Sequence, residues 1–231
     1  MQLYGRGIRR RPAPMLGDAK RLQLAYSIVL SLPGTPVLRY GDEIGMGDNL
    51  RLKERNAIRT PMQWSDEPNG GFSTADAVVR TPIERGPYGY ERVNVEEQRR
   101  NESSLLRWTA RMIRLRKQCP EIGWGDWRIV PTGSSAVLAI EYSWRGSAIV
   151  CLHNLVDEPR EATLALGGGT LANLVDAEEI GARRGGVHHV ALDPYGYRWF
   201  RVGEVTPALA RSTACAVARG ASSPHARARG R

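Results

Sequence analysis

Residues 35–46 read TPVLRYGDEIGM, a short apolar run that ends at Gly41 and two adjacent carboxylates, Asp42 and Glu43. The run predicts a buried strand over residues 35–40, because parallel strands are covered on both faces and are apolar throughout. In an α/β barrel, functional groups lie on the loops that follow the strands. The sequence therefore predicts a barrel strand that carries the two carboxylates to the barrel mouth.

The flanking segments predict two helices. Asp18 can cap the first, in which apolar residues recur at helical spacing over residues 19–32 before Pro33 and Gly34 end it. The second is predicted over residues 103–118, with one apolar stripe and with arginines at other positions that are typical of a solvated face. The members of the stripe are Leu105, Trp108, Met112 and Leu115, and the arginines are Arg107, Arg111, Arg114 and Arg116.

The remaining N-terminal segments predict irregular structure. Residues 1–16 are polar and interrupted by prolines, which favours a loop that leads to the first helix. Residues 47–100 form a long polar loop, and loops of this length in a compact protein are usually functional or mobile. Its aromatic and proline content indicates that it folds against the rest of the protein.

From Trp124 onward the apolar pattern changes to period two, with turn residues between the segments. Short strands at this spacing predict an antiparallel β-sandwich. The seven predicted strands span residues 127–131, 137–144, 147–155, 161–166, 171–174, 188–192 and 197–202. Residues 204–231 are rich in Ala, Arg and Ser without an apolar pattern, which predicts a disordered basic tail.

Two motifs resemble a known family. VLRYGDEIGM (37–46) and RTPMQW (59–64) are similar to the last strand and following loop of the catalytic barrel in the α-amylase superfamily, glycoside hydrolase family 13. Within it, they resemble the branch of α-glucosidases and trehalose synthases. EIGWG (121–125) and the opening MQLYGRGIRR (1–10) look like the trehalose synthases of that branch. The likeness covers roughly residues 1–202.

The resemblance implies an α+β architecture. Residues 1–122 would be the C-terminal part of a (β/α)8 barrel, including the long loop, and residues 123–203 an all-β C-terminal domain. The implied family reaction is isomerisation of maltose to trehalose by retaining glucosyl transfer, in carbohydrate metabolism. The resemblance places the family's nucleophile, acid/base and third aspartate on strands four, five and seven, before Met1. We therefore expect no catalytic residue here, an inactive chain, and poor folding of residues 1–118 without the missing strands.

Four residues are predicted to bind substrate: Arg59, Asp42, Glu43 and Gln63. By resemblance, the arginine that opens RTPMQW lies beside the sugar pocket, although a structural ion pair within the loop is an equal alternative. Asp42 and Glu43 should point in opposite directions, so one could border the pocket, while the alternative is that both hold the loop. Loop scaffolding is the alternative for Gln63, and packing beneath the loop is the alternative to sugar stacking for Trp64 and Phe72.

Composition limits the other function classes. The formal charge is +9, but arginines concentrate near the N-terminus and in the tail, so nucleic acid is not an expected partner. No apolar run is long enough to span a membrane and no signal peptide is evident, which predicts a cytoplasmic protein. Cys119, Cys151 and Cys215 are predicted to be free thiols, and no metal or cofactor is expected.

Several alternatives remain open at this point. The chain could be the product of a truncated, split or misannotated gene, or a fragment of an α-glucosidase. It could also be a noncatalytic module that binds glucan or assembles with a full-length enzyme. The predicted partner is a small sugar, maltose or trehalose, once other residues complete the barrel.

Overall fold

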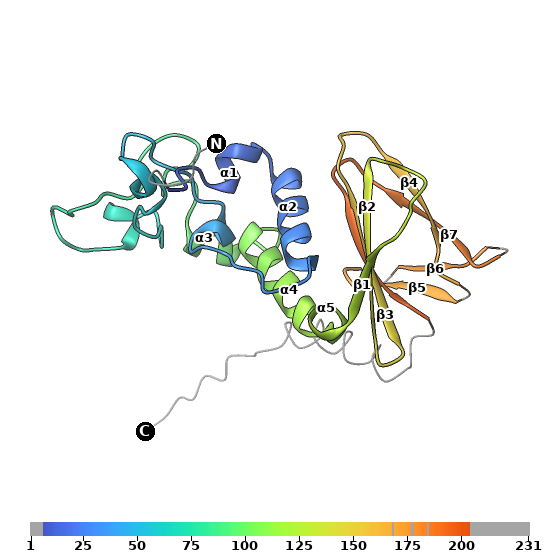
Figure 1. The fold of residues 1–231 in the computed structure, drawn as a ribbon. Coiled ribbons are helices and arrows are strands. Elements are labelled where there is room, and N and C mark those ends of the chain that lie inside the picture. Colours follow the sequence, from blue (N-terminus) through green and yellow to red (C-terminus); the bar gives the residue numbers. More distant parts are fainter. Residues whose placement is uncertain (1–6, 168, 177, 184, 204–231) are drawn as a thin grey trace, which may run out of the picture.

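The computed structural model describes residues 7–167, 169–176, 178–183 and 185–203. Figure 1 shows helices and a long irregular loop on one side and strands on the other. The α-helices are α1 (Pro12–Leu16), α2 (Ala19–Ser31), α3 (Val95–Arg100), α4 (Leu105–Lys117) and α5 (Pro120–Trp124). Three 3₁₀ helices lie in and before the loop: η1 (Asp42–Ile44), η2 (Glu54–Ile58) and η3 (Pro68–Gly71). The prediction of a loop over residues 47–100 is wrong for Val95–Arg100, which form α3 with Asn94 as its cap. The helical part ends at α5, next to the predicted division after residue 122.

The two long helices confirm the predictions made from apolar spacing. Asp18 caps α2 by accepting a hydrogen bond of 3.0 Å from the Arg21 backbone N–H. Ser104 caps α4 in the same way, accepting from Arg107 at 3.3 Å. Each cap satisfies one of the N–H groups that a helix leaves unpaired at its start.

The prediction of a loop over residues 1–16 is wrong for Pro12–Leu16, which form α1. Pro12 starts that helix because the first turn needs no N–H from proline, and its fixed φ already suits a helix. The error came from treating the prolines only as a sign of irregular structure. Residues 1–6 lie outside the described structure.

The strands form two antiparallel sheets. The strands are β1 (Asp126–Ile129), β2 (Val137–Trp144), β3 (Ser147–Asn154), β4 (Arg160–Ala165), β5 (Thr170–Asn173), β6 (Glu179–Gly181), β7 (Val187–Leu192) and β8 (Tyr197–Val202). Six of them form a sheet in the order β1-β2-β3-β8-β5-β6, and β4 pairs with β7 in the second. Apolar side chains of both sheets, including Val150, Leu164 and Phe200, fill the core between them. The predicted β-sandwich is confirmed, and only the short β6 was not predicted.

The predicted strand over residues 35–40 does not form. Residues 35–39 have no regular secondary structure, Tyr40 lies in a turn, and Val37 is 83% exposed. A strand exists only when a neighbour completes its hydrogen bonds, and the described residues supply no such neighbour. Leu38 nevertheless packs against the core that α2 and α4 share, so one face of the segment is covered.

A second core joins the helices to the six-stranded sheet. Trp199 of β8 is fully buried there, and its indole N–H donates to Ser27 Oγ of α2 at 3.0 Å. The Trp108 indole of α4 donates to Tyr197 Oη at 2.5 Å. The β-domain therefore covers the apolar faces of α2 and α4. The expected poor folding of residues 1–118 stays a prediction. It was argued from the missing barrel strands alone and did not consider packing against the β-domain.

His153 gives this second core a predicted sensitivity to acid. Complete burial lowers the pKa of His153 from 6.5 to about 3, so the folded imidazole stays neutral while the unfolded one binds a proton below pH 6.5. Stability should therefore fall as the pH drops from 6.5 towards 3. We expect a loss of about 2–3 kcal/mol between pH 7 and 4.5, measured by urea unfolding at both values.

The control for this prediction is a second histidine. His153→Gln should flatten the pH dependence, and His189→Gln, at a partly exposed histidine of β7, is the matched substitution outside this core. Equal pH dependence in wild type and His153→Gln would show that other groups cause the acid sensitivity.

Candidate functional site

A sharp turn at Gly41 precedes the two predicted site carboxylates, Asp42 and Glu43. Gly41 has φ of 85°, a left-handed conformation that glycine adopts at little cost, and η1 follows it at once. Glu43 borders an open hollow, while Asp42 pairs with Arg11 on another side of the turn. The expectation that the two carboxylates diverge agrees with this geometry.

Arg11 stabilises the turn through its side chain, and the residue is only 1% exposed. Its Nη1 donates to Asp42 Oδ1 and to the carbonyl oxygen of Tyr40, both at 2.9 Å, and its Nη2 donates to the Ile58 carbonyl oxygen at 2.9 Å. The guanidinium carbon also lies 5.3 Å from the centre of the Tyr40 ring. Arg11 thus connects the start of α1, the turn and the end of η2.

Sequence reasoning missed this role of Arg11. The residue stands in a run of three arginines, and nothing in the run separates it from its neighbours. Its position directly before Pro12, at the N-cap of α1, was the available signal. A rigid cap position can fix a long side chain, but only the fold brings Asp42 and Ile58 within its reach.

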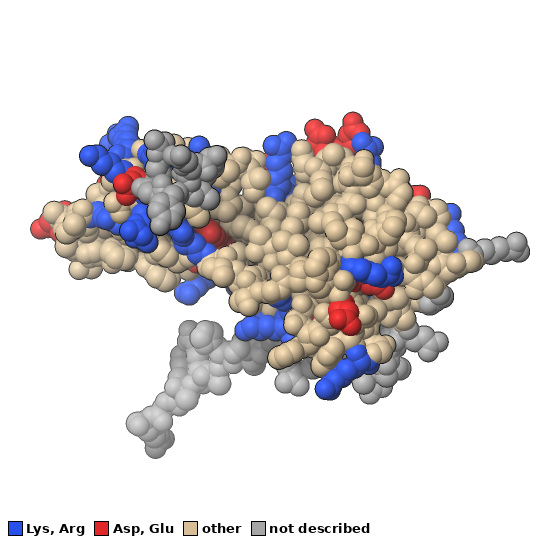
Figure 2. All heavy atoms as spheres, viewed as in Figure 1, with Lys and Arg blue, Asp and Glu red and all other residues tan. Residues whose placement is uncertain are grey.

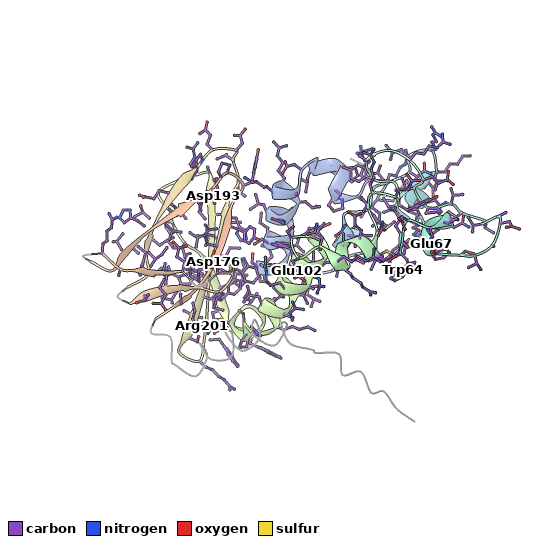
Figure 3. All side chains as sticks on the ribbon, turned by 180° about the vertical axis from the view of Figure 1, so that it is seen from behind. Trp64, Glu67, Glu102, Asp176, Asp193 and Arg201 are labelled. Carbon is purple, nitrogen blue, oxygen red and sulfur yellow. The ribbon has the colours of Figure 1, made fainter. Side chains whose placement is uncertain are left out.

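The hollow beside Glu43 has a volume of about 760 Å³. Arg59, Trp64 and Phe72 line it together with Tyr40, and Trp64 and Phe72 are each about half exposed, at 47% and 52%. Figure 3 shows Trp64 on the long loop, close to Glu67. An exposed indole and phenyl ring can stack on a sugar ring, and the guanidinium beside them can donate to the sugar's hydroxyl groups.

Glu43 also borders a second hollow of about 450 Å³, which it shares with Trp64, Arg99 and Arg107. Burial raises the pKa of Glu43 above its ordinary value, although hydrogen bonds from the backbone oppose this effect. The group therefore holds its proton to a higher pH than a free carboxyl group does. In its protonated form it can donate to a sugar oxygen, and in its ionised form it can accept from a hydroxyl.

Arg59 lies at the rim of the larger hollow and is exposed. Its carbonyl oxygen accepts a hydrogen bond of 3.2 Å from Arg80 Nη1, which fixes the backbone there. Among the described residues its guanidinium makes no ion pair, so the alternative of a structural pair within the loop is not realised in them. Contact with a sugar stays a prediction for Arg59 and for Glu43.

Gln63 and Asp42 serve the scaffold. The Gln63 side chain is fully buried, and its amide donates to the carbonyl oxygens of Tyr88 at 3.1 Å and Val93 at 2.5 Å. Asp42 is committed to Arg11. A sugar could reach either group only if these bonds broke, so we leave both out of the proposed contacts. This follows the scaffold alternative for Gln63.

The described residues hold no cluster of three or more His, Cys, Asp or Glu placed to bind a metal. Cys119 and Cys151 are free and buried, and burial raises the pKa of Cys119 to about 12. Cys215 lies outside the described part of the chain. None of the described helices is long and apolar enough to cross a lipid bilayer.

Basic and acidic side chains lie in several separate groups on the face shown in Figure 2. Some of the basic groups are paired, as in the 2.8 Å ion pair between Arg10 and Asp48. Arg116, predicted to be solvated, is partly buried and donates to the Gly34 carbonyl oxygen at 2.6 Å. The expected lack of a nucleic-acid partner stays a prediction, and the basic tail lies outside the described residues.

A model of the α-amylase catalytic domain matches residues 10–125, about half of the chain. The chain belongs to the α-amylase family. A model of the sucrose hydrolase-like C-terminal domain matches residues 146–201, within the β-sandwich. Both matches confirm the resemblance seen in the motifs.

Among relatives of this family member, the trehalose synthase of Pimelobacter sp. strain R48 is 40% identical over 206 residues, which are 85% of this chain and 36% of that protein. The trehalose synthase of Thermus thermophilus is 38% identical over 213 residues, 88% of this chain and 22% of that protein. A crystal structure of the trehalulose synthase MutB from Pseudomonas mesoacidophila MX-45 shares the fold, with a TM-score of 0.66 and 22% identity. That match covers 84% of this chain and 41% of MutB. The chain thus spans about a third or less of the two synthases.

Proposed function

We propose that this chain forms the C-terminal part of a trehalose synthase-like catalytic unit, which converts maltose to trehalose by retaining glucosyl transfer. The observation that carries the proposal is the 40% identity to a trehalose synthase across both the helical part and the β-domain. The hollow beside Glu43 and Arg59 has the size and lining of a sugar site, which supports the same assignment.

In the proposed role, Arg59 donates to sugar hydroxyls and Trp64 stacks on a ring face at the outer part of the site. A planar guanidinium presents several donors in a fixed geometry, which suits neighbouring hydroxyl groups. Glu43 lies on the same hollow and can exchange a hydrogen bond with a hydroxyl in either protonation state. These groups bind and orient the sugar. They form no covalent bond to it.

The glucosyl transfer itself needs two carboxyl groups about 5 Å apart on the two sides of the scissile bond, one as nucleophile and one as acid/base. Asp42 and Glu43 cannot form that pair, because Arg11 holds Asp42 away from the hollow. We therefore propose that the reacting carboxylates come from residues outside this sequence. The chain alone is then inactive, and its partner is a polypeptide that carries the rest of the barrel.

The test is a complementation assay. The purified chain is incubated with maltose, alone and after coexpression with the part of the Pimelobacter trehalose synthase that precedes the matched region. We expect trehalose only from the combination. Arg59→Ala should then lower kcat/KM about tenfold or more, because a charge-assisted hydrogen bond contributes about 1.5–3 kcal/mol.

The matched control is Arg51→Ala, since Arg51 is also an exposed loop arginine but does not line the hollow. It should leave kcat/KM unchanged. Trehalose formed by the chain alone, and abolished by Glu43→Gln, would overturn the proposed inactivity. A combination that folds together but stays inactive on maltose would overturn the assigned reaction.

A further inference from the structure

A smaller hollow lies between α2 and the turn that joins β7 to β8, and it shares no residue with the hollow beside Glu43. Its volume is about 160 Å³. Lys20 and Gln23 of α2 line one side, and Asp193, Tyr195 and Arg198 line the other. Figure 3 shows Asp193 on the side of the β-domain that is next to the helices. The helical part and the β-domain together therefore build this hollow.

The turn at this hollow is held rigidly. The Asp193 carbonyl oxygen accepts from Asn154 Nδ2 and from the Gly196 N–H, both at 2.8 Å, and the Tyr195 N–H donates to the Val156 carbonyl oxygen at 3.0 Å. Tyr195 has φ of 54°, a left-handed conformation that is costly for a residue with a large side chain. Such strain persists where surrounding bonds enforce it, and it gathers at binding sites.

Arg21 fixes the Tyr195 side chain in this strained position. Its Nη2 donates to Tyr195 Oη at 2.9 Å, and its guanidinium carbon lies 4.8 Å from the centre of the ring. The ring forms a preset wall of the hollow, so little conformational entropy is lost when a ligand contacts it.

The other polar groups of the hollow are available to a ligand. Arg198 Nη1 donates to the Tyr197 carbonyl oxygen at 3.1 Å, but its Nε lies 3.9 Å from Glu178 and its Nη2 3.8 Å from Asp193, which is too far for a hydrogen bond. The Asp193 side chain is 76% exposed, and Lys20 is also exposed. Gln23 adds an amide that can both donate and accept. Donors and acceptors thus surround one small space.

Size and charge define the class of ligand. A volume of 160 Å³ equals about five water molecules in the liquid, which is too little for a peptide or nucleic-acid segment and enough for one small polar ring. Lys20 and Arg198 disfavour a metal cation, and the Asp193 carboxylate at the same hollow disfavours an anion. The hollow therefore offers both hydrogen-bond donors and hydrogen-bond acceptors. They match a neutral molecule that has several hydroxyl groups.

We infer that this hollow binds a single hexopyranose ring, such as the glucosyl unit at one end of maltose, without acting on it. Gln23 and Asp193 recognise its hydroxyls from opposite sides, and the Tyr195 ring contacts its apolar edge. The choice of glucose among hexoses rests on the proposed function, whereas the site itself rests on the geometry. A bound sugar would join α2 to the β-domain.

Titration of the isotope-labelled full chain with glucose and with maltose, followed by backbone amide NMR, tests this inference. We expect saturable shifts at residues 20–23 and 193–198, with a dissociation constant on the order of 1 mM for a ligand of about a dozen heavy atoms. Gln23→Ala and Asp193→Ala should each weaken binding about three- to tenfold, since each removes one hydrogen-bonding group. Neither change touches the carbonyl oxygen that anchors the turn, so both variants should fold.

The controls use the same residue types elsewhere. Gln118→Ala and Asp157→Ala change exposed residues outside the hollow and should leave the affinity as in wild type. Shifts confined to residues 59–80, or no saturation with either sugar, would overturn the inference. Inorganic phosphate that binds at residues 20–23 and 193–198 where glucose does not would also overturn it. The titration measures no turnover, so its failure is separate from failure of the complementation assay.

Discussion

Arg11→Met should lower the free energy of unfolding by about 3–5 kcal/mol, because the change leaves a largely buried carboxylate without its partner. Asp42 is 12% exposed, and the Arg11 guanidinium provides its ion pair at 2.9 Å. The carbonyl oxygens of Tyr40 and Ile58 would lose their donor as well. Methionine keeps most of the volume of the side chain, so the loss reports the polar contacts rather than a cavity. Urea unfolding at pH 7 measures it.

A neighbouring arginine is the control for this prediction. Arg10 also pairs with a carboxylate, at 2.8 Å from Asp48, but its side chain is 45% exposed. Exposed pairs contribute about 0–1 kcal/mol, so Arg10→Met should change stability by no more than that. Asp42→Asn combined with Arg11→Met should cost less than the sum of the two single changes. Equal losses for Arg10→Met and Arg11→Met would contradict the role assigned to Arg11.

Helices and strands with local signals were predictable from the sequence. The α2 helix shows both its cap at Asp18 and its stop at Pro33, and β2 and β8 have the predicted bounds. These elements depend on spacing and capping within a few residues, which the sequence displays directly. The sandwich followed because strands such as β4 alternate between buried and exposed residues, although β3 is buried along most of its length.

Residues 35–40 show the opposite case. Their apolar pattern predicts a buried strand, but a strand also needs neighbouring strands that can lie far away in the chain or outside it. The described residues contain none beside this segment, and Val37 is left exposed. The local apolar pattern therefore indicates that the segment can form a strand, while neighbouring strands decide whether it does.

Some residues of the candidate site could likewise be predicted from local sequence, and others could not. Arg59 and Glu43 were found from a motif, and both line the larger hollow. Arg11 and Gln63 depend on contacts between residues 25 or more positions apart, such as the 47 that separate Arg11 from Ile58. The residue spacings that identify helices and strands give no information on contacts at such separations. The smaller hollow at Gln23 and Asp193 was beyond sequence reasoning for that reason too, since it forms only where α2 meets the β-domain.

Trp199→Ala should destabilise the chain by about 3–5 kcal/mol, the usual cost of removing a buried aromatic side chain. Trp199 is fully buried in the core that joins α2 and α4 to the sheet, and its indole N–H donates to Ser27. The cavity would open where α2 and α4 pack against the sheet, while the core between the two sheets stays filled. We therefore expect amides of α2 to lose protection in hydrogen exchange before those of β2 and β3 do.

The next residue along β8 provides the matched comparison. Phe200 is also fully buried but faces the core between the sheets, so Phe200→Ala should cost a similar free energy and lower protection in β2, β3 and α2 together. Trp127→Ala, at a site that is 53% exposed, should cost less than about 1 kcal/mol. If α2 kept its full protection in Trp199→Ala, the helices would have to be stable without the sheet. The β-domain would then be a neighbour of the helices rather than the surface on which they fold.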